Sequence, residues 1–160
     1  MSLESVKAFF ATHAPEVAVI VTEQSSATVT LAAAAHNVEP DQIAKTICLR
    51  AGDKVVLLVA SGNSRLDNRK FRDRFSAKPR MLGPEEVVEQ TGHPVGGVCP
   101  FGLANPLTVY LDESLRKYPI VVPAAGATNS AVHLSPDRMA ELTAGTWVDV
   151  CQEPKADAAQ

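Results

Sequence analysis

Residues 45–60, KTICLRAGDKVVLLVA, decide the fold of this chain. They hold two runs rich in β-branched and other apolar residues, 45–51 and 54–60, with Gly52 and Asp53 between them. Two such runs on either side of a Gly/Asp pair are typical of a β-hairpin. We therefore predict an antiparallel hairpin here, the clearest one in the sequence.

The segments around this hairpin predict further helices and strands. Helices are expected over residues 2–13, 28–36, 66–75, 84–91, 112–117 and 135–142, and strands over residues 16–22, 107–111, 120–122, 132–134 and 146–151. The two kinds of element do not alternate regularly enough for a doubly wound sheet. The sequence predicts an α+β fold in one domain, residues 1–152, with a mixed, mostly antiparallel sheet flanked by helices and a polar tail over residues 153–160.

Length and composition exclude several classes of protein. The chain has 160 residues, 46% of them hydrophobic and 21% charged, which is typical of a globular domain and not of a disordered chain. No apolar run approaches the roughly 20 residues that span a bilayer, so no membrane association is expected. The start, MSLESVKAFF, lacks the basic and long apolar regions of a secretory signal.

The cysteines and histidines form no metal-binding pattern. Three cysteines stand far apart without a CxxC pair, and four histidines show no HxH or HxxxH spacing, so no metal site is expected. Reduced thiols in a cytoplasmic protein are the simplest interpretation. The chain also lacks GxGxxG and GxxxxGK[ST], so the sequence does not support a nucleotide-phosphate loop.

The charge is unevenly distributed. The net charge is −3, yet residues 65–80 carry seven bases and two acids. A protein that wraps long DNA is usually basic overall, so no DNA partner is expected, whereas contact with the end of a nucleic acid needs only one basic patch. The alternative is a solvated, arginine-rich helix face.

The segment 92–102, GHPVGGVCPFG, is the first candidate for chemistry. It holds four glycines and two prolines, which excludes a helix interior or a central strand. A rigid loop with exposed amides can bind an anion or an oxyanion. An ordinary tight turn is the alternative.

Several single residues are candidates beside this loop. Lys45 begins a strand and can place its ammonium over a sheet-edge cleft, or it is a plain surface lysine. Cys99 is either a nucleophile served by His93 or an apolar wall of a pocket. Polar contacts with a ligand, or only the capping of a helix, are expected from Asn63, Asp67 and Lys70.

Four segments together resemble the YbaK-type prolyl-tRNA editing family. They are KTICLR with Lys45, VASGNSRLDNRKF, GGVCPFG and AAGATNSAVHLSP, and the resemblance runs from about residue 17 to residue 150. Its most specific feature is Lys45 on its strand followed, about fifty residues later, by a GxxxP loop at residues 96–100. Cys99 stands where many relatives carry serine, and residues 129–131 stand where cysteine-removing members often have an aspartate.

The resemblance implies a fold, an activity and roles for residues. It implies a partly barrel-like sheet and a free-standing enzyme, without metal or cofactor, that hydrolyses mischarged aminoacyl-tRNA. The implied partners are the tRNA acceptor end, of tRNA(Pro), and prolyl-tRNA synthetase. The implied roles are that Lys45 holds a phosphate or the reacting end, while the backbone of Gly96, Gly97 and Val98 positions the ester and the water. Cys99, Pro100, Asn129 and Ser130 are expected in substrate binding, with a small wrong amino acid such as alanine preferred over cysteine.

Two other functions remain open at this point. One is a module that binds the acceptor end of tRNA without hydrolysing the ester. The other is a hydrolase that depends on Cys99 and His93.

Overall fold

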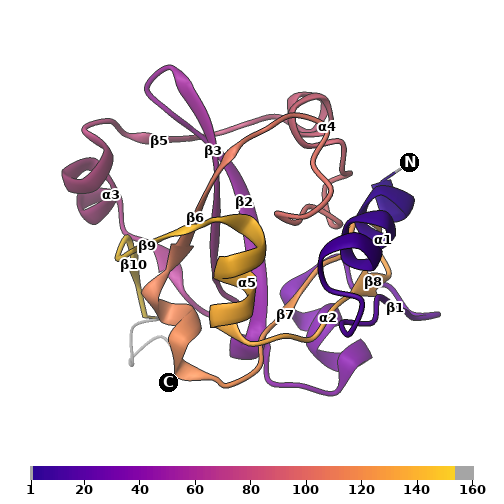
Figure 1. Ribbon diagram of the computed structural model, residues 1–160. Helices are drawn as coiled ribbons and strands as arrows, with labels where there is room; N and C mark the ends of the chain where they lie inside the picture. Colours follow the sequence, from indigo (N-terminus) through magenta and orange to yellow (C-terminus); the bar gives the residue numbers. More distant parts are fainter. Residues whose placement is uncertain (1, 154–160) are drawn as a thin grey trace.

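A long hairpin runs through the middle of the molecule (Figure 1). The structure is a computed structural model and describes residues 2–153. β2 (Ile43–Ala51) and β3 (Lys54–Ser61) pair antiparallel from Ala44 opposite Ser61 to Ala51 opposite Lys54. Gly52 makes the turn with a positive φ of 65°, which glycine adopts without strain. The predicted hairpin is confirmed.

The hairpin belongs to a six-stranded sheet in the order β5-β2-β3-β6-β9, with β7 also paired to β2. The added strands are β5 (Pro79–Met81), β6 (Thr108–Asp112), β7 (Val122–Pro123) and β9 (Thr146–Val148). β2 pairs antiparallel with β3 and β5, whereas the pairs β2–β7, β3–β6 and β6–β9 are parallel. The α+β fold with a mixed sheet is confirmed. Parallel pairs are more numerous than predicted because long connections, and not tight turns, lead from β3 to β6 and from β6 to β9.

Two short antiparallel pairs lie beside this sheet. They are β1 (Ile20–Val21) with β8 (Ser130–Ala131), and β4 (Arg65–Leu66) with β10 (Cys151–Gln152). The partly barrel-like sheet is not confirmed, since the strand order of the described residues is open from β5 to β9.

Side chains cap the N-terminal ends of three of the α-helices. The α-helices are α1 (Ser2–His13), α2 (Val29–His36), α3 (Asn68–Phe75), α4 (Pro84–Thr91) and α5 (Pro136–Thr143), with short 3₁₀ helices η1 (Pro40–Gln42) and η2 (Glu113–Lys117). Thr28, Asp67 and Ser135 cap α2, α3 and α5 and so precede the helices rather than belong to them. No helix within residues 2–153 is long and apolar enough to cross a membrane.

Three strand predictions need correction. Of residues 16–22, only Ile20–Val21 forms a strand, paired at the edge with β8. The strand expected at 132–134 is wrong: β8 covers Ser130–Ala131 only, and Leu134 makes just an isolated bridge to Val121. The strand expected at 146–151 is split into β9 and β10 because Val150 leaves the ladder: its N–H donates to Asp112 Oδ1 at 2.8 Å and its carbonyl accepts from Asp67.

Helices cover both faces of the central hairpin. Leu57 and Val59 of β3 pack into a core with α1, α4 and α5, whereas Val56, Leu58 and Ala60 pack into a second core with Phe71 of α3. This alternation explains the unbroken apolar run of β3, because a strand buried on both faces needs apolar residues at every position. The expected polar tail falls, apart from Glu153, outside the described residues, and the domain boundary at residue 152 stays a prediction.

Candidate active site

A cavity of about 340 Å³ opens at one edge of β2. β7 pairs with Ile43 and Ala44 of this strand and β5 pairs with Leu49–Ala51, so residues 45–48 have no strand partner on that edge within the described chain. The cavity fills this gap and is lined mostly by apolar side chains, among them Val29, Ile43, Cys48, Leu82, Val87, Val98 and Val122. Among residues 2–153, no aspartate or glutamate lines it.

Unpaired strand edges carry hydrogen-bonding groups of the main chain. Successive residues of a strand direct their N–H and C=O groups alternately to the two sides. Two of the four residues 45–48 therefore direct main-chain groups at the cavity. Within an apolar pocket, a few such polar groups fix the orientation of a ligand.

Residues 92–102, the glycine-rich loop, form the wall of the cavity opposite β2. Gly96 and Val98 line it, whereas Gly97 is buried against residues 126–127 and its carbonyl accepts from Gly126 at 3.0 Å. Gly97 also donates to Pro94 at 2.9 Å, so both of its main-chain groups are used inside the fold. Within residues 2–153, the N–H groups of Gly96 and Val98 donate to no protein acceptor, which leaves them available for a ligand. Gly96 adopts φ 94°, a conformation that favours glycine.

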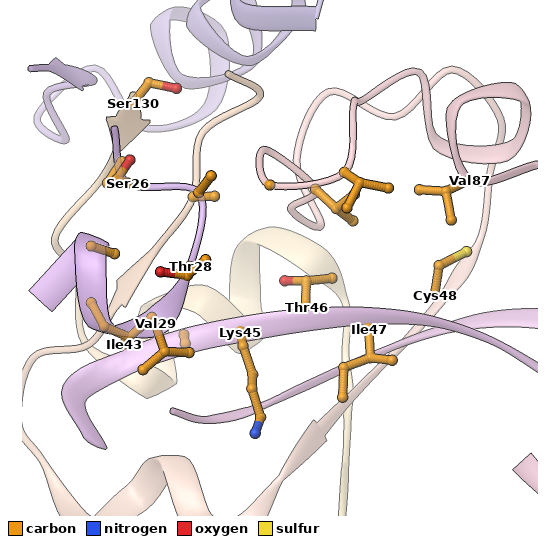
Figure 2. A pocket seen from close by; sticks show the side chains of 18 of the residues that line it. Ser26, Thr28, Val29, Ile43, Lys45, Thr46, Ile47, Cys48, Val87 and Ser130 are labelled. Atoms are coloured by element: carbon orange, nitrogen blue, oxygen red, sulfur yellow. The ribbon is translucent and has the colours of Figure 1, made fainter. Parts of the chain in front are cut away.

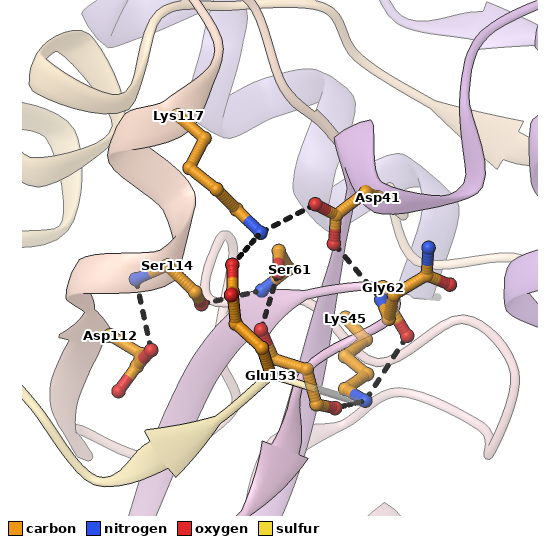
Figure 3. Close-up of polar contacts among 10 residues, drawn as sticks. Asp41, Lys45, Ser61, Gly62, Asp112, Ser114, Lys117 and Glu153 are labelled. Atoms are coloured by element: carbon orange, nitrogen blue, oxygen red, sulfur yellow. Dashed lines mark hydrogen bonds and ion pairs between the residues drawn. The ribbon is translucent and has the colours of Figure 1, made fainter. Parts of the chain in front are cut away.

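Lys45 lies on the unpaired part of β2, with its ammonium directed away from the cavity (Figure 2). The ammonium donates to the carbonyl oxygens of Gly62, at 3.2 Å, and of Ser64 (Figure 3). Burial lowers the pKa of Lys45. An ammonium carries three N–H donors, so one remains for a further acceptor.

The turn whose carbonyl oxygens accept from Lys45 has room only for glycine at position 62. A Cβ at position 62 would meet the carbonyl oxygen of Pro40 at 2.0 Å. Asp41 braces the same turn, since it accepts from the Asn63 N–H at 3.2 Å and pairs with Lys117 at 2.6 Å (Figure 3). The carbonyls that hold Lys45 are therefore fixed in place.

Thr46 points to the cavity side of β2, opposite to Lys45 (Figure 2). It lines the cavity, and its hydroxyl oxygen is buried without a hydrogen-bond partner within residues 2–153. The other hydroxyls of the lining have partners: Ser26 donates to Thr128, Thr28 accepts from Leu31, and Ser130 accepts from Ala127. Sequence reasoning missed Thr46, although its position next to Lys45 in a strand already assigns it to the other face.

Cys99 and His93 lie close together but deep inside the core. Cys99 Sγ is 3.6 Å from His93 Nε2, and both residues are fully buried. His93 Nε2 lies 2.7 Å from the carbonyl oxygen of Phe101, which can only accept, so this nitrogen carries a proton and cannot take one from the thiol. Burial raises the pKa of Cys99 to about 12. Neither residue lines the cavity, and this arrangement gives Cys99 no means of acting as a nucleophile.

The remaining sequence candidates divide between the cavity and the rest of the fold. Ser130 lines the cavity, whereas Pro100 is buried outside the lining and Asn129 donates to the carbonyl of Thr22 at 2.9 Å. Asp67 caps α3, and Lys70 pairs with Asp149 at 3.0 Å. The structure therefore brings together Lys45, Gly96, Val98 and Ser130. It places Asn63, Asp67, Lys70, Cys99, Pro100 and Asn129 outside the lining.

Residues 65–80, the basic segment, lead to this cavity. This segment runs through α3 into β5, where Arg80 is followed by Met81 and Leu82 of the cavity lining (Figure 1). Met81 and Val95 are exposed by 70% and 58%, so the cavity has an apolar rim beside a basic approach.

The chain belongs to the aminoacyl-tRNA editing domain family, which matches residues 23–142. It is therefore an enzyme of aminoacyl-tRNA editing, and tRNA is its substrate. Protein YwhH of Bacillus subtilis, whose function is uncharacterised, is 48% identical over 96% of this chain and 99% of its own length. EbsC of Enterococcus faecalis, provisionally named a Cys-tRNA(Pro)/Cys-tRNA(Cys) deacylase, is 28% identical over 71% of this chain and 70% of its own.

The fold has a close counterpart among solved structures. A crystal structure provisionally described as a trans-editing enzyme for prolyl tRNA synthetase superposes with a TM-score of 0.87 at 32% identity. The superposition covers 94% of this chain and 97% of that one. The resemblance drawn from the sequence is thus confirmed at the level of family and fold.

Proposed function

We propose that this chain hydrolyses mischarged aminoacyl-tRNA in trans, and that its substrate is tRNA(Pro) carrying a small wrong amino acid, alanine or cysteine. The observation that carries the proposal is the cavity between the glycine-rich loop and the open edge of β2, at which the basic segment ends. Its volume is at the lower end of the roughly 300–1,000 Å³ found for ligand pockets. The name of EbsC supports cysteine among the candidates.

The free N–H groups of Gly96 and Val98 are the proposed donors to the ester carbonyl. Water attacks the carbonyl carbon, negative charge develops on the carbonyl oxygen, and the ester C–O bond breaks as the ribose oxygen takes up a proton. Fixed donors aimed at this oxygen lower the barrier without needing to reorganise. An aminoacyl ester is already activated, so positioning and charge stabilisation replace a protein nucleophile.

Lys45 is proposed to bind the tRNA side of the scissile ester. Its ammonium lies on the face of β2 opposite Thr46, where burial and, to a smaller extent, the charge of Arg65 at the beginning of the basic segment lower the pKa of Lys45. A substrate that crosses the open edge of β2 places the amino acid in the cavity. The terminal phosphate or ribose of this substrate then accepts a hydrogen bond from the third N–H of Lys45. Exposed arginines of α3 would contact the acceptor stem, and prolyl-tRNA synthetase is the proposed source of the charged tRNA.

The first experiment is deacylation of alanyl-, cysteinyl-, seryl- and threonyl-tRNA(Pro) by wild type, Lys45→Ala and Lys54→Ala. Lys54 is exposed at the turn of the same hairpin and serves as the matched control. We expect wild type and Lys54→Ala to turn over at least one substrate and Lys45→Ala to be slower by about 10- to 100-fold, the effect of losing one hydrogen bond between a charged group and the substrate.

The same proteins are assayed for tRNA binding. No turnover of any substrate by wild type, with tRNA still bound, would contradict the proposal and establish a non-catalytic binding module. Equal turnover by wild type and Lys45→Ala would remove Lys45 from the mechanism.

A further inference from the structure

We infer that the Thr46 hydroxyl selects the side chain of the wrong amino acid, favouring one that carries a hydroxyl or thiol over the methyl of alanine. The inference rests on the proposed function and ranks its candidate substrates, with cysteinyl and seryl esters above alanyl esters. Its basis is the unpartnered hydroxyl in the wall of a mostly apolar cavity.

The unpartnered state of Thr46 sets it apart from the other polar residues of the lining. Ser26, Thr28 and Ser130 all use their hydroxyls to hold the chain segments that surround the cavity. Removing any of them would disturb the walls. Thr46 Oγ1 holds nothing in the described chain, and buried polar groups without partners are rare in folded proteins. The partner of this oxygen is therefore expected from an occupant of the cavity.

The charge of the cavity limits which part of the substrate reaches Thr46. Among residues 2–153 no carboxylate lines the cavity, so it offers no counter-ion to the α-ammonium of an aminoacyl ester. An ammonium without a counter-ion is costly to bury, so this group stays at the solvated mouth, as do the phosphates. The neutral side chain is the end of the substrate that an apolar cavity buries.

The geometry of Thr46 allows it to meet such a side chain. Its side chain points from β2 toward the glycine-rich loop, into the space between Thr28 and Val87 (Figure 2). The Thr46 hydroxyl oxygen is buried in its present rotamer, and a rotation of about 120° around Cα–Cβ moves it to the place now held by the methyl group or by the hydrogen of Cβ. A seryl or cysteinyl side chain then supplies the missing hydrogen-bond partner, whereas an alanyl side chain leaves the oxygen unpaired. Sites built around a buried polar group reject the analogue that lacks its partner.

Binding of stable analogues tests this inference independently of catalysis. The probes are 3′-seryl- and 3′-alanyl-amino-3′-deoxyadenosine, in which an amide replaces the labile ester, and the variants are Thr46→Val and Thr46→Ser. For wild type, calorimetry should show the seryl analogue binding about tenfold more tightly than the alanyl analogue, the worth of one neutral hydrogen bond. Thr46→Val keeps the shape of threonine without its hydroxyl and should bind the two analogues equally, while Thr46→Ser should restore the preference.

The thermal midpoint provides a second measurement. Because the hydroxyl has no partner within the protein, Thr46→Val should melt at the same temperature as wild type or higher. A clear drop in melting temperature would show that the hydroxyl has a structural partner and would overturn the inference.

The remaining outcomes separate this inference from the proposed function. Equal binding of both analogues to wild type, or an equal loss of both in Thr46→Val, would overturn the selectivity of Thr46 and leave deacylation standing. If wild type binds neither analogue and hydrolyses no mischarged tRNA, both proposals fail.

Discussion

Cys99 and His93 lie close enough to act as a nucleophile and its base, but their burial prevents that role. The sulfur of Cys99 lies within 3.6 Å of His93, as the spacing of six residues allowed, but both side chains are fully buried and the histidine proton is directed at a carbonyl. The sequence also predicts that Cys99 lines the pocket for the amino acid. Val98 lines the cavity, but Cys99 does not.

We therefore expect Cys99→Ala to hydrolyse the four mischarged tRNAs in the same order of preference as wild type. Its free energy of unfolding should fall by about 1–2 kcal/mol, typical of a buried truncation. Cys151→Ala, which removes a buried thiol outside the cavity, is the matched control. Initial rates and urea unfolding are the measurements. A folded Cys99→Ala protein without any activity would instead restore the thiol-dependent hydrolase.

Two neighbouring residues of β2 with proposed roles point to opposite faces of the strand. Lys45 and Thr46 are adjacent in sequence, yet one is held by the carbonyls of the turn after β3 and the other lines the cavity. The period of two along a strand predicts this division. It does not predict that the edge of the strand is open between them.

At the scale of elements, the glycine-rich loop depends on close contact with a segment thirty residues further along the chain. A Cβ at Gly97 would lie 2.8 Å from the Ala127 nitrogen and 2.9 Å from the carbonyl carbon of Gly126. These are backbone atoms that cannot move aside as a flexible side chain can. Glycine at this position therefore sets the distance between the loop and the segment after β7.

Gly97→Ala should displace the loop. We expect a destabilisation of about 1–3 kcal/mol, as for other overpacked sites, and at least a tenfold loss of turnover. Gly83→Ala is the matched control, because a Cβ there meets nothing within 4 Å and its φ of −73° suits alanine. Thermal melts and initial rates give the comparison. A Gly97→Ala protein equal to wild type in both would show that the loop tolerates movement.

At the scale of the whole molecule, the basic segment lies next to the cavity along the chain. α3 presents exposed arginines on one side of the hairpin, and β5 connects this helix to the rim of the cavity (Figure 1). Lys70 is paired with Asp149, and Arg74 lies over the rings of Phe75 and Tyr110, so both have partners within the protein. Arg69 and Arg72 remain as exposed residues suited to bind phosphates.

The double variant Arg69→Ser/Arg72→Ser should raise KM for full-length charged tRNA and leave kcat unchanged. The dependence of log affinity on log salt should become shallower by roughly 0.7–0.9 for each phosphate that the variant no longer neutralises. Hydrolysis of a short aminoacyl-adenosine should not change, since this substrate cannot reach α3. Lys7→Ser, which removes an exposed base from α1, is the control. An unchanged KM and salt dependence would identify the basic segment as a solvated helix face.

The sequence by itself determined the family and most of the elements. Local signals suffice for these: apolar runs around Gly52 define the hairpin, Ser135 followed by Pro136 marks the start of α5, and four short segments in a fixed order predict the family that the domain match confirms. Such signals depend on residues close together in the chain or on short motifs in a fixed order.

Only the tertiary structure decided which residues share the cavity. The gap at residues 45–48 exists because β5 and β7, from distant parts of the chain, pair with the two ends of β2 and leave its middle open. The Thr46 hydroxyl is buried without a partner within residues 2–153, and Cys99 is buried in a core built from distant parts of the chain. Burial and edge pairing depend on contacts between residues far apart in sequence, and no local pattern carries that information.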